Sequence, residues 1–291
     1  MTNASSKKAD FAKLSSIALT TRKDIIKMLG IAGSGHPGGS LSSTEILIAL
    51  YYYAMRHDPK NPKWADRDRL IYSKGHGSPA LYSVMSQAGY IDPKLLLTFR
   101  QLESPLQGHP DMRRIPGIEM STGSLGQGLS VGAGCALAAQ YDKKDFMTYV
   151  VMSDGELNEG QTWEAAMFAA HRKLSNLVLI LDMNKYQLTA STKDTLNMDP
   201  VPDKWKAFGW AVKEINGHSF EELVAALDWV KTSKQAPSVI IAHTIKGKGV
   251  SFMENNNHFH GVAPTKDETL RALKELGEND AEIQRILGMI A

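Results

Sequence analysis

Two apolar runs joined by one helical segment dominate the middle of the chain. Residues 148–152 and 177–181 are rich in valine, leucine and isoleucine without polar alternation, and residues 162–173 between them have helical spacing. Unbroken apolar runs are typical of strands buried on both faces, and two of them separated by a helix indicate a right-handed βαβ unit. The unit therefore predicts two parallel strands. The large apolar residues expected to share one face of its helix are Trp163, Met167 and Phe168.

Polar residues follow both runs at the point where each strand is expected to end. Asp154 and Gly155 come after the first run, and Asn184 comes after the second. Because parallel strands place their carboxyl ends on one edge of the sheet, Asp154 and Asn184 are expected to converge. A carboxylate and an amide oxygen suit Mg²⁺, and a glycine followed by a helix start suits a phosphate group. An ordinary Asp-Gly turn and a strand-ending asparagine are the alternative.

Composition narrows the class of protein. The 291 residues suffice for one large α/β domain or two small ones, and 33 basic against 31 acidic residues give no electrostatic case for nucleic acid or an anionic membrane. The only cysteine, Cys135, excludes an internal disulfide and is expected in the core. Lys7 and Lys8 precede no apolar segment, and no run approaches the roughly 18 apolar residues of a membrane span, so a cytoplasmic protein is expected.

Other segments repeat the alternation of strands and helices. Helical spacing marks residues 10–29, 41–53, 80–88, 203–209, 220–232 and two stretches of the tail, while apolar runs mark strands at 69–72, 210–215 and 238–244. A glycine-rich loop is expected at residues 33–40. Such alternation predicts a three-layer α/β/α fold with a mainly parallel sheet.

Several histidines lie in expected loops beside glycine. They are His36, His76, His109 and either His258 or His260. Histidine donates and accepts hydrogen bonds and moves protons near neutral pH, which suits a polyhydroxylated substrate. Lys246 follows the last expected strand, in a loop that also contains Gly247 and Gly249. Two explanations of this lysine are open, a phosphate contact or an ordinary solvated loop.

The segment from Asp154-Gly155 to Asn184 resembles the thiamine diphosphate fingerprint, although Ser153 stands where glycine is usual and Met183 where aspartate or asparagine is common. With the loops added, residues 30–265 resemble the N-terminal, diphosphate-binding region of transketolase in family order. Ser124 departs from a proline common there. The matching segments are 35–37, 74–77, 108–110, 122–128, 154–184, 246–249 and 260–261.

The resemblance implies a thiamine diphosphate-binding fold and a role for each matching residue. Mg²⁺, or Ca²⁺ or Mn²⁺ in its place, would be held by Asp154, Asn184 and the backbone carbonyl of Tyr186. The sugar channel would be lined by His36, His109 and His260, which would assist proton transfers. Glu159 would lie near the cofactor or a subunit interface. The remaining cofactor contacts would be His76, Gly123, Ser124, Leu125, Gly155, Asn184, Lys246 and His260.

The resemblance also implies an activity and a partner. Transketolases use thiamine diphosphate to move a two-carbon ketol unit from a ketose phosphate to an aldose phosphate in carbohydrate metabolism, with the cofactor between two domains. After Gly261 only a linker-like tail, residues 265–291, remains. Residues 1–291 are therefore expected to form a single cofactor-binding domain. The pyrimidine-binding and C-terminal domains would belong to a separate polypeptide, in an α2β2 heterotetramer.

Two other interpretations stay open at this point. The α subunit of a 2-oxo acid dehydrogenase has a similar Asp-Gly to Asn unit and is also split, but several loop histidines fit a sugar phosphate better than a short oxo acid. A cofactor-binding module without turnover would remain inactive even after the matching subunit was added.

Overall fold

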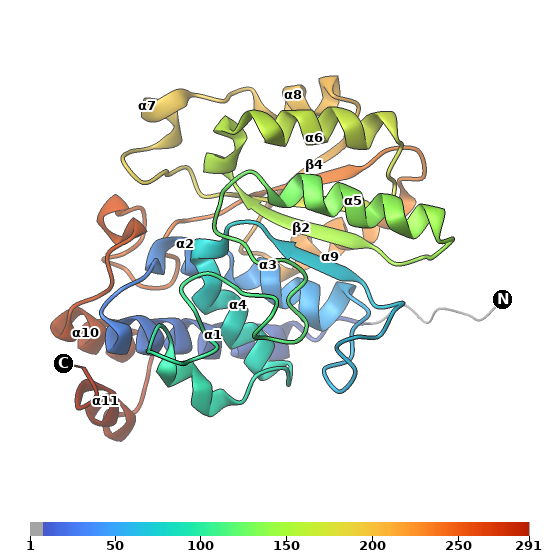
Figure 1. The fold of residues 1–291 in the computed structure, drawn as a ribbon. Coiled ribbons are helices and arrows are strands. Elements are labelled where there is room, and N and C mark those ends of the chain that lie inside the picture. The colour runs from blue at the N-terminus through green and yellow to red at the C-terminus, as the bar shows by residue number, and fades with distance from the viewer. Residues whose placement is uncertain (1–7, 291) are drawn as a thin grey trace.

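Five parallel strands form the central sheet of the computed structural model, which describes residues 8–290 (Figure 1). Their spatial order is β1-β2-β3-β5-β4, and every neighbouring pair is parallel. Because β2, β3 and β5 are covered on both faces, their apolar runs carry no polar alternation. The predicted fold class is confirmed. The strands are β1 (Arg69–Tyr72), β2 (Thr148–Ser153), β3 (Leu177–Met183), β4 (Ala211–Asn216) and β5 (Ser238–His243).

One face of the sheet is covered mainly by helices from the N-terminal third of the chain (Figure 1). Strand residues such as Tyr149, Ile180 and Ile240 point to this side and join one large apolar core. The helices on this side are α1 (Phe11–Ala32), α2 (Pro37–Ser42), α3 (Thr44–Ala49), the π-helical turn η1 (Leu50–Ala54), α4 (Ser78–Gln87), α9 (Phe220–Trp229) and the 3-10 turn η5 (Val230–Thr232).

The opposite face is covered by α5 (Gly128–Tyr141), α6 (Gly160–His171) and α8 (Val201–Ala207), and a second apolar cluster fills this layer. Ala133 and Ala136 of α5 and Ala166 of α6 face the sheet, and their small side chains let both helices pack close to it. Alternate residues of each strand therefore reach two separate cores, which is the three-layer arrangement. The short helix α7 (Thr192–Leu196) lies in the segment after β3.

The tail forms two helices, as predicted, and both pack near α1 (Figure 1). α10 (Lys266–Glu275) begins with a capping box, in which the side chains of Thr265 and Glu268 each accept a hydrogen bond from the other residue's backbone amide. α11 (Asp280–Leu287) buries Ile283 and Ile286, and Lys27 of α1 contacts Glu278 at 2.7 Å and Glu282 at 2.9 Å. The tail is thus part of the helical layer beside α1.

Two helix predictions near the N-terminus were wrong in detail. The glycine-rich loop predicted at residues 33–40 is shorter, because α2 begins at Pro37, and proline fits the first turn of a helix. The tight turn before it uses Gly33 at φ +60° and Gly35 at φ +134°. The single helix predicted at 41–53 is interrupted at Ser43 and ends in the π-helical turn η1.

The predicted apolar face of the helix in the βαβ unit was also wrong. Trp163 packs on Trp205 with ring centroids 5.1 Å apart, but Met167 is 54% and Phe168 39% exposed. The alanines of α6 form its buried stripe because the helix lies close to the sheet. Cys135, expected in the core, is only partly buried on α5, although burial still raises the pKa of its thiol.

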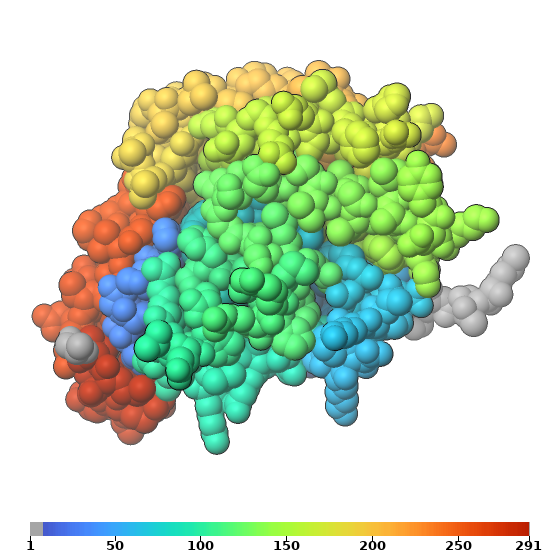
Figure 2. Space-filling model, in the orientation of Figure 1, coloured from blue at the N-terminus to red at the C-terminus, as the bar shows by residue number. Residues whose placement is uncertain are grey.

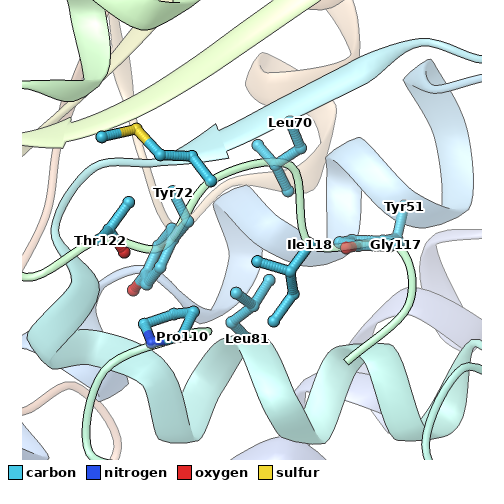
Figure 3. A pocket seen from close by; sticks show the side chains of 9 residues that line it. Tyr51, Leu70, Tyr72, Leu81, Pro110, Gly117, Ile118 and Thr122 are labelled. Carbon is cyan, nitrogen blue, oxygen red and sulfur yellow. The ribbon is translucent and has the colours of Figure 1, made fainter. Parts of the chain in front are cut away.

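The long loop between η3 (Pro93–Thr98) and α5 packs over β1 and α4. Pro110 and Ile118 of this loop lie against Tyr72 and Leu81 (Figure 3). The void they enclose measures about 10 Å³, which is the space of a single water molecule. This seam is therefore a packing contact that fixes the loop, and it is too small for a ligand.

Within residues 8–290, no helix has the length and apolar character needed to cross a membrane.

Candidate functional site

The carboxyl ends of β2 and β3 lie side by side, as the βαβ unit predicts. The two strands pair in register up to Ser153 and Asp182, and each then passes into a polar segment. After β2 the chain forms the short 3-10 helix η4 (Asp154–Asn158). The Lys185 amide beyond β3 donates to Asp154 Oδ2 at 2.5 Å, which joins the two strand ends directly.

A cavity of about 340 Å³ opens at this edge of the sheet. Segments after β1, β2, β3 and β5 and the loops before α2 and α5 contribute to its wall. Figure 2 shows the yellow segment after β3 beside the orange segment after β5, and the Asn257 side chain donates to the Leu188 carbonyl between them at 2.8 Å. The lining residues are His36, Gly39, His76, His109, Gly123, Leu125, Ser153, Gly155, Asn158, Glu159, Asn184, Tyr186, Gln187, Leu188, Lys246 and His260.

Three imidazoles meet in this cavity from three different parts of the chain. His36 precedes α2, His76 lies in the 3-10 turn η2 (Gly75–Gly77), and His260 ends the 3-10 helix η6 (Asn257–His260). Their ring centroids are 5.2 to 5.7 Å apart, and the His76 and His260 rings are stacked. Of the two histidines in η6, His260 therefore faces the cavity, whereas the His258 ring packs on the Phe259 ring with centroids 5.1 Å apart.

The positive charge in the cavity belongs to Lys246. Its Nζ donates to His260 Nδ1 at 2.6 Å and to two neutral oxygens, on Gln187 and Asn257, at 3.1 Å. Burial first, and the charge of Lys74 second, lower the pKa of Lys246 to about 8. Lys246 has no carboxylate partner within residues 8–290. A cation with only neutral acceptors beside a cavity favours an anionic ligand.

The histidines are neutral at pH 7. Burial, reinforced by nearby positive groups, lowers the pKa of His36 to about 4 and that of His260 to about 3. The same causes hold the pKa of His76 well below its usual range and lower that of His109. Each neutral imidazole has one donor and one acceptor nitrogen, so the ring cluster can hydrogen-bond hydroxyl groups without adding charge.

Several polar atoms at the cavity wall are buried without a hydrogen-bond partner. In the described chain these include His36 Nδ1, Asn158 Oδ1 and Gln187 Nε2. Buried polar atoms in folded proteins are nearly always paired, so such a group at one cavity indicates a polar ligand. The wall thus supplies both donors and acceptors for a polar ligand.

Beneath the cavity lies a fully buried ion pair that sequence reasoning missed. Lys74, after β1, contacts the Asp182 carboxylate at the end of β3, and both side chains are 0% exposed. Lys74 also donates to the Gly39 carbonyl at 2.8 Å, while Ser42 at 2.7 Å and Thr244 donate to Asp182. This paired floor joins β1, β3, β5 and α2. An aspartate at the end of an apolar run was the available signal.

Glu156 is a second buried group that sequence reasoning missed. One of its oxygens accepts hydrogen bonds from Ser73 and from the Gly126 amide at 3.0 Å. The other accepts from the Ser153 amide at 2.8 Å. Although burial raises the pKa of Glu156, these donors oppose the rise. Glu156 therefore ties the loop with Gly123 and Leu125 to the ends of β1 and β2.

The three expected metal ligands lie near one another but not on a single surface. Asn184 and Tyr186 line the cavity, and the Asn184 Oδ1 accepts the Tyr186 amide at 3.2 Å. Asp154 is 2% exposed and faces an adjoining cavity of about 420 Å³, which Tyr186 also lines. Burial first, and then Asp182, raise the pKa of Asp154 to about 7. No cluster of three or more His, Cys, Asp or Glu side chains suits a metal in residues 8–290.

Other expected site residues divide into two groups. Gly123, Leu125, Gly155 and Glu159 line the cavity with the histidines, whereas Ser124 is exposed and outside the lining. The sequence prediction did not include Gly39, Ser153, Asn158, Gln187 or Leu188, which also line it. Their segments were expected at the site, but nothing in residue type alone distinguished them from ordinary loop residues.

Fold and site together define an α/β domain that presents polar and positively charged groups at the carboxyl edge of a parallel sheet, where such domains bind phosphorylated cofactors. The chain matches the family model described as transketolase, thiamine diphosphate binding domain, over residues 15–286. It belongs to that family. The predicted family is confirmed, and the match decides for it over a 2-oxo acid dehydrogenase subunit.

Two kinds of relatives match the chain. It is 46% identical to the 6-deoxy-6-sulfo-D-fructose transketolase subunit SqwG of a Clostridium species, with 89% of this chain and 94% of that one covered. It is 41% identical to an apulose-4-phosphate transketolase subunit of Phocaeicola vulgatus, with 91% and 94% covered. The solved transketolase of Campylobacter jejuni superposes with a TM-score of 0.87 at 34% identity. The superposition covers 97% of this chain but only 46% of that structure.

Proposed function

We propose that this chain is the thiamine diphosphate-binding subunit of a two-component transketolase. It would transfer a two-carbon ketol unit from a ketose or its phosphate to an aldose or its phosphate, together with a separate subunit. The observation that carries the proposal is the cavity of about 340 Å³, in which Lys246 and the neutral histidines meet at the carboxyl edge of the sheet. The family match supports the cofactor, and the near-complete coverage of two relatives named as subunits supports the division into two components.

The residues at the cavity fit a diphosphate. Lys246, His76 and His260 would donate to its oxygens, and Gly155 leaves room for it beside the η4 backbone. Asp154, Asn184 and the Tyr186 carbonyl would hold Mg²⁺, with Ca²⁺ or Mn²⁺ as substitutes, and the cation would compensate the buried Asp154 carboxylate. When bound, the cofactor supplies the electron sink for carbon–carbon bond cleavage.

Residues around the rest of the cavity would handle the sugar. His36, His109 and His260 would hydrogen-bond its hydroxyls and accept or return a proton at a ring nitrogen. His260 Nδ1 accepts a hydrogen bond from the Lys246 ammonium, so the proton of the neutral His260 ring lies on Nε2. Gly123 and Leu125 would contact the cofactor, Ser124 would do so through backbone atoms, and Glu159 would lie near the cofactor or the subunit interface.

The separate subunit would carry the pyrimidine-binding domain and close the cavity from the open side. We propose that residues 1–291 act as one cofactor-binding domain and that two copies of each subunit form an α2β2 heterotetramer. The relatives' names mention a sulfonated ketose and apulose 4-phosphate, so the sugar of this chain need not belong to the pentose phosphate pathway.

The activity is tested by adding candidate partner subunits. The chain is co-purified with each partner, and turnover is measured with thiamine diphosphate, Mg²⁺, a ketose donor and an aldose acceptor. Ketol transfer is expected only in the complex. Normal turnover by the chain alone would exclude the two-component arrangement, and no turnover with a stably bound matching partner would indicate a binding module.

The cation site is tested with Asp154→Ala. Calorimetry should show that Mg²⁺-dependent binding of thiamine diphosphate falls by at least about 100-fold, because the only carboxylate of the proposed set is lost. Asp199→Ala, in the wall of the adjoining cavity, is the matched control and should bind as the unaltered chain does. Unchanged affinity in Asp154→Ala would reject the assignment.

A further inference from the structure

Lys246 depends on the backbone of the short loop at residues 244–249, which follows β5. Gly247 adopts φ +81°, and its amide donates to the Gly38 carbonyl at 3.1 Å. A Cβ on Gly38 would lie only 2.9 Å from Lys246 Cγ, so the lysine stem passes tightly along α2. The direction of Lys246 is therefore fixed by whatever fixes this loop.

Behind the loop lies a buried polar cluster that the cavity does not include. Its members are Arg22 of α1, Glu45 of α3 and His218 of the turn between β4 and α9. Arg22 donates to Glu45 Oε1 at 2.6 Å, and His218 Nδ1 lies 3.0 Å from Glu45 Oε2. We call these three residues the anchor cluster. Both carboxylate oxygens are occupied, one by each neighbour.

Burial makes the anchor cluster rigid. Glu45 is 5% and Arg22 8% exposed, so neither charge can exchange its partner for water without cost. Burial raises the pKa of Glu45, but the hydrogen bonds from His218 and Arg22 and the charge of Arg22 outweigh burial and lower it. Glu45 is thus held as a carboxylate in a single geometry.

The anchor cluster holds the loop at the residues on either side of Lys246. The Ile245 amide donates to His218 Nε2 at 2.8 Å, and Arg22 Nε donates to the Lys248 carbonyl at 2.9 Å. Because Nε2 accepts a hydrogen bond, the His218 proton lies on Nδ1 and points to Glu45. A Cβ on Gly249 would come within 2.6 Å of Arg22 Cδ, which shows how closely the loop lies on the cluster.

We propose that Arg22, Glu45 and His218 are positioning residues that hold the 244–249 loop so that Lys246 faces the diphosphate. None of them lines the cavity, and they act through the backbone of the neighbouring residues 245 and 248. The role toward a diphosphate rests on the proposed function, whereas the hold on the loop does not.

Two substitutions of His218 test its hydrogen bonds to Glu45 and to Ile245 separately. In His218→Asn the amide nitrogen can still donate to Glu45, but the Ile245 amide loses its acceptor. In His218→Gln the longer side chain can still accept from Ile245, but the bond to Glu45 is lost. Hydrogen exchange in peptides covering residues 244–249 should quicken about 10-fold in His218→Asn and less than threefold in His218→Gln, because only the first leaves the loop amide unpaired.

The unaltered chain and each variant are titrated with inorganic pyrophosphate and with thiamine diphosphate, each in the presence of Mg²⁺. We expect about 10-fold weaker binding in His218→Asn and in Arg22→Lys, which cannot donate to the Lys248 carbonyl from an Nε position. Lys27→Met is the matched control, since it breaks the α1 ion pairs with Glu278 and Glu282, neither of which belongs to the loop, and should lower thermal stability without changing loop exchange or affinity.

The outcomes are separable. Equal loop exchange in His218→Asn, His218→Gln and Lys27→Met would overturn the proposed hold. Faster loop exchange with unchanged affinity would overturn the role toward the diphosphate. Failure of the unaltered chain to bind either ligand would count against the proposed function, while the exchange experiment would still judge the hold on the loop.

Discussion

The floor and the wall of the cavity treat buried charge in opposite ways. In the floor, Lys74 and Asp182 are fully buried and satisfy each other, with hydroxyl and carbonyl groups completing their contacts. In the wall, within residues 8–290, Lys246 donates to neutral acceptors only, and His36 has a buried ring nitrogen without a hydrogen-bond partner. The two charges of the floor neutralise each other, whereas the charge of Lys246 in the wall meets only uncharged groups among the described residues.

This difference indicates that the floor stabilises the fold, whereas the wall binds the ligand. Removing one member of a paired buried set leaves an isolated charge, so the floor should govern the free energy of unfolding. Removing a group that has no ionic partner costs the free protein little, so the wall should govern affinity. Substitutions in the two regions test whether stability and affinity are separated in this way.

The largest effect is expected in the floor. Lys74→Met strands the Asp182 carboxylate in the interior and should lower the free energy of unfolding by about 3–5 kcal/mol, measured by urea denaturation. The double variant Lys74→Met/Asp182→Leu should recover part of that loss, because no charge remains unpaired. A loss below about 1 kcal/mol in the single variant would contradict the contrast between floor and wall.

In the wall, Lys246→Met should leave the free energy of unfolding within about 1 kcal/mol of the unaltered chain, since no ion pair is broken. Its affinity for thiamine diphosphate should fall about 10- to 100-fold through loss of charge-assisted hydrogen bonds. Lys248→Met is the control: Lys248 contacts Glu254 at 3.2 Å and does not line the cavity. Equal affinities of the two variants would show that position 246 is not special.

The neutral histidines predict a pH dependence of the ligand-free chain. Their pKa values fall from 6.5 to about 4 for His36 and about 3 for His260, so the unfolded chain binds more protons between these limits. The stability they confer is therefore complete above about pH 6.5 and is lost as the pH falls toward 4 and 3. Unfolding free energies at pH 7.5, 6 and 5 should decrease less steeply in His36→Asn/His260→Asn. An unchanged slope would reject this origin.

The smallest effects come from two glycines. Gly155 lies in helix η4, and a Cβ there would be 3.5 Å from Gln187 Cγ, so Gly155→Ala should fold normally but bind the diphosphate about 10-fold more weakly by crowding its approach. Gly134 on α5 has open space around its Cβ, and Gly134→Ala should raise stability by about 0.5–1 kcal/mol without changing affinity. Calorimetry and thermal unfolding distinguish the two.

Much of the fold could be predicted because local patterns are direct consequences of burial. Unbroken apolar runs identified β2, β3 and β5, since strands covered on both faces leave no polar side. The buried face of α6 was predicted wrongly, because alanines carry a weak apolar signal even where they pack closest to the sheet. The start of α2 was missed because glycine-rich sequence is more typical of loops.

Part of the site could likewise be predicted from sequence motifs, and part depended on tertiary contacts. The sequence placed Asp154, Asn184, Lys246 and several histidines in loops beyond strand ends, because a parallel sheet gathers those ends at one edge. Residue type and loop position alone did not distinguish His260 from His258, and only the family resemblance pointed to His260. In the structure, the turn of η6 aims the His260 ring at the cavity.

The order of strands and helices, and therefore the edge at which the polar loops gather, follows from the pattern of apolar residues along the chain. The pairing of buried polar groups became visible in the folded chain alone: Lys74 contacts Asp182, 108 positions away in the sequence, and Glu45 contacts His218, 173 positions away. Hydrophobic periodicity is a local property that each segment carries with it, whereas the partner of a buried charge is set by the packing of segments that are remote in the chain.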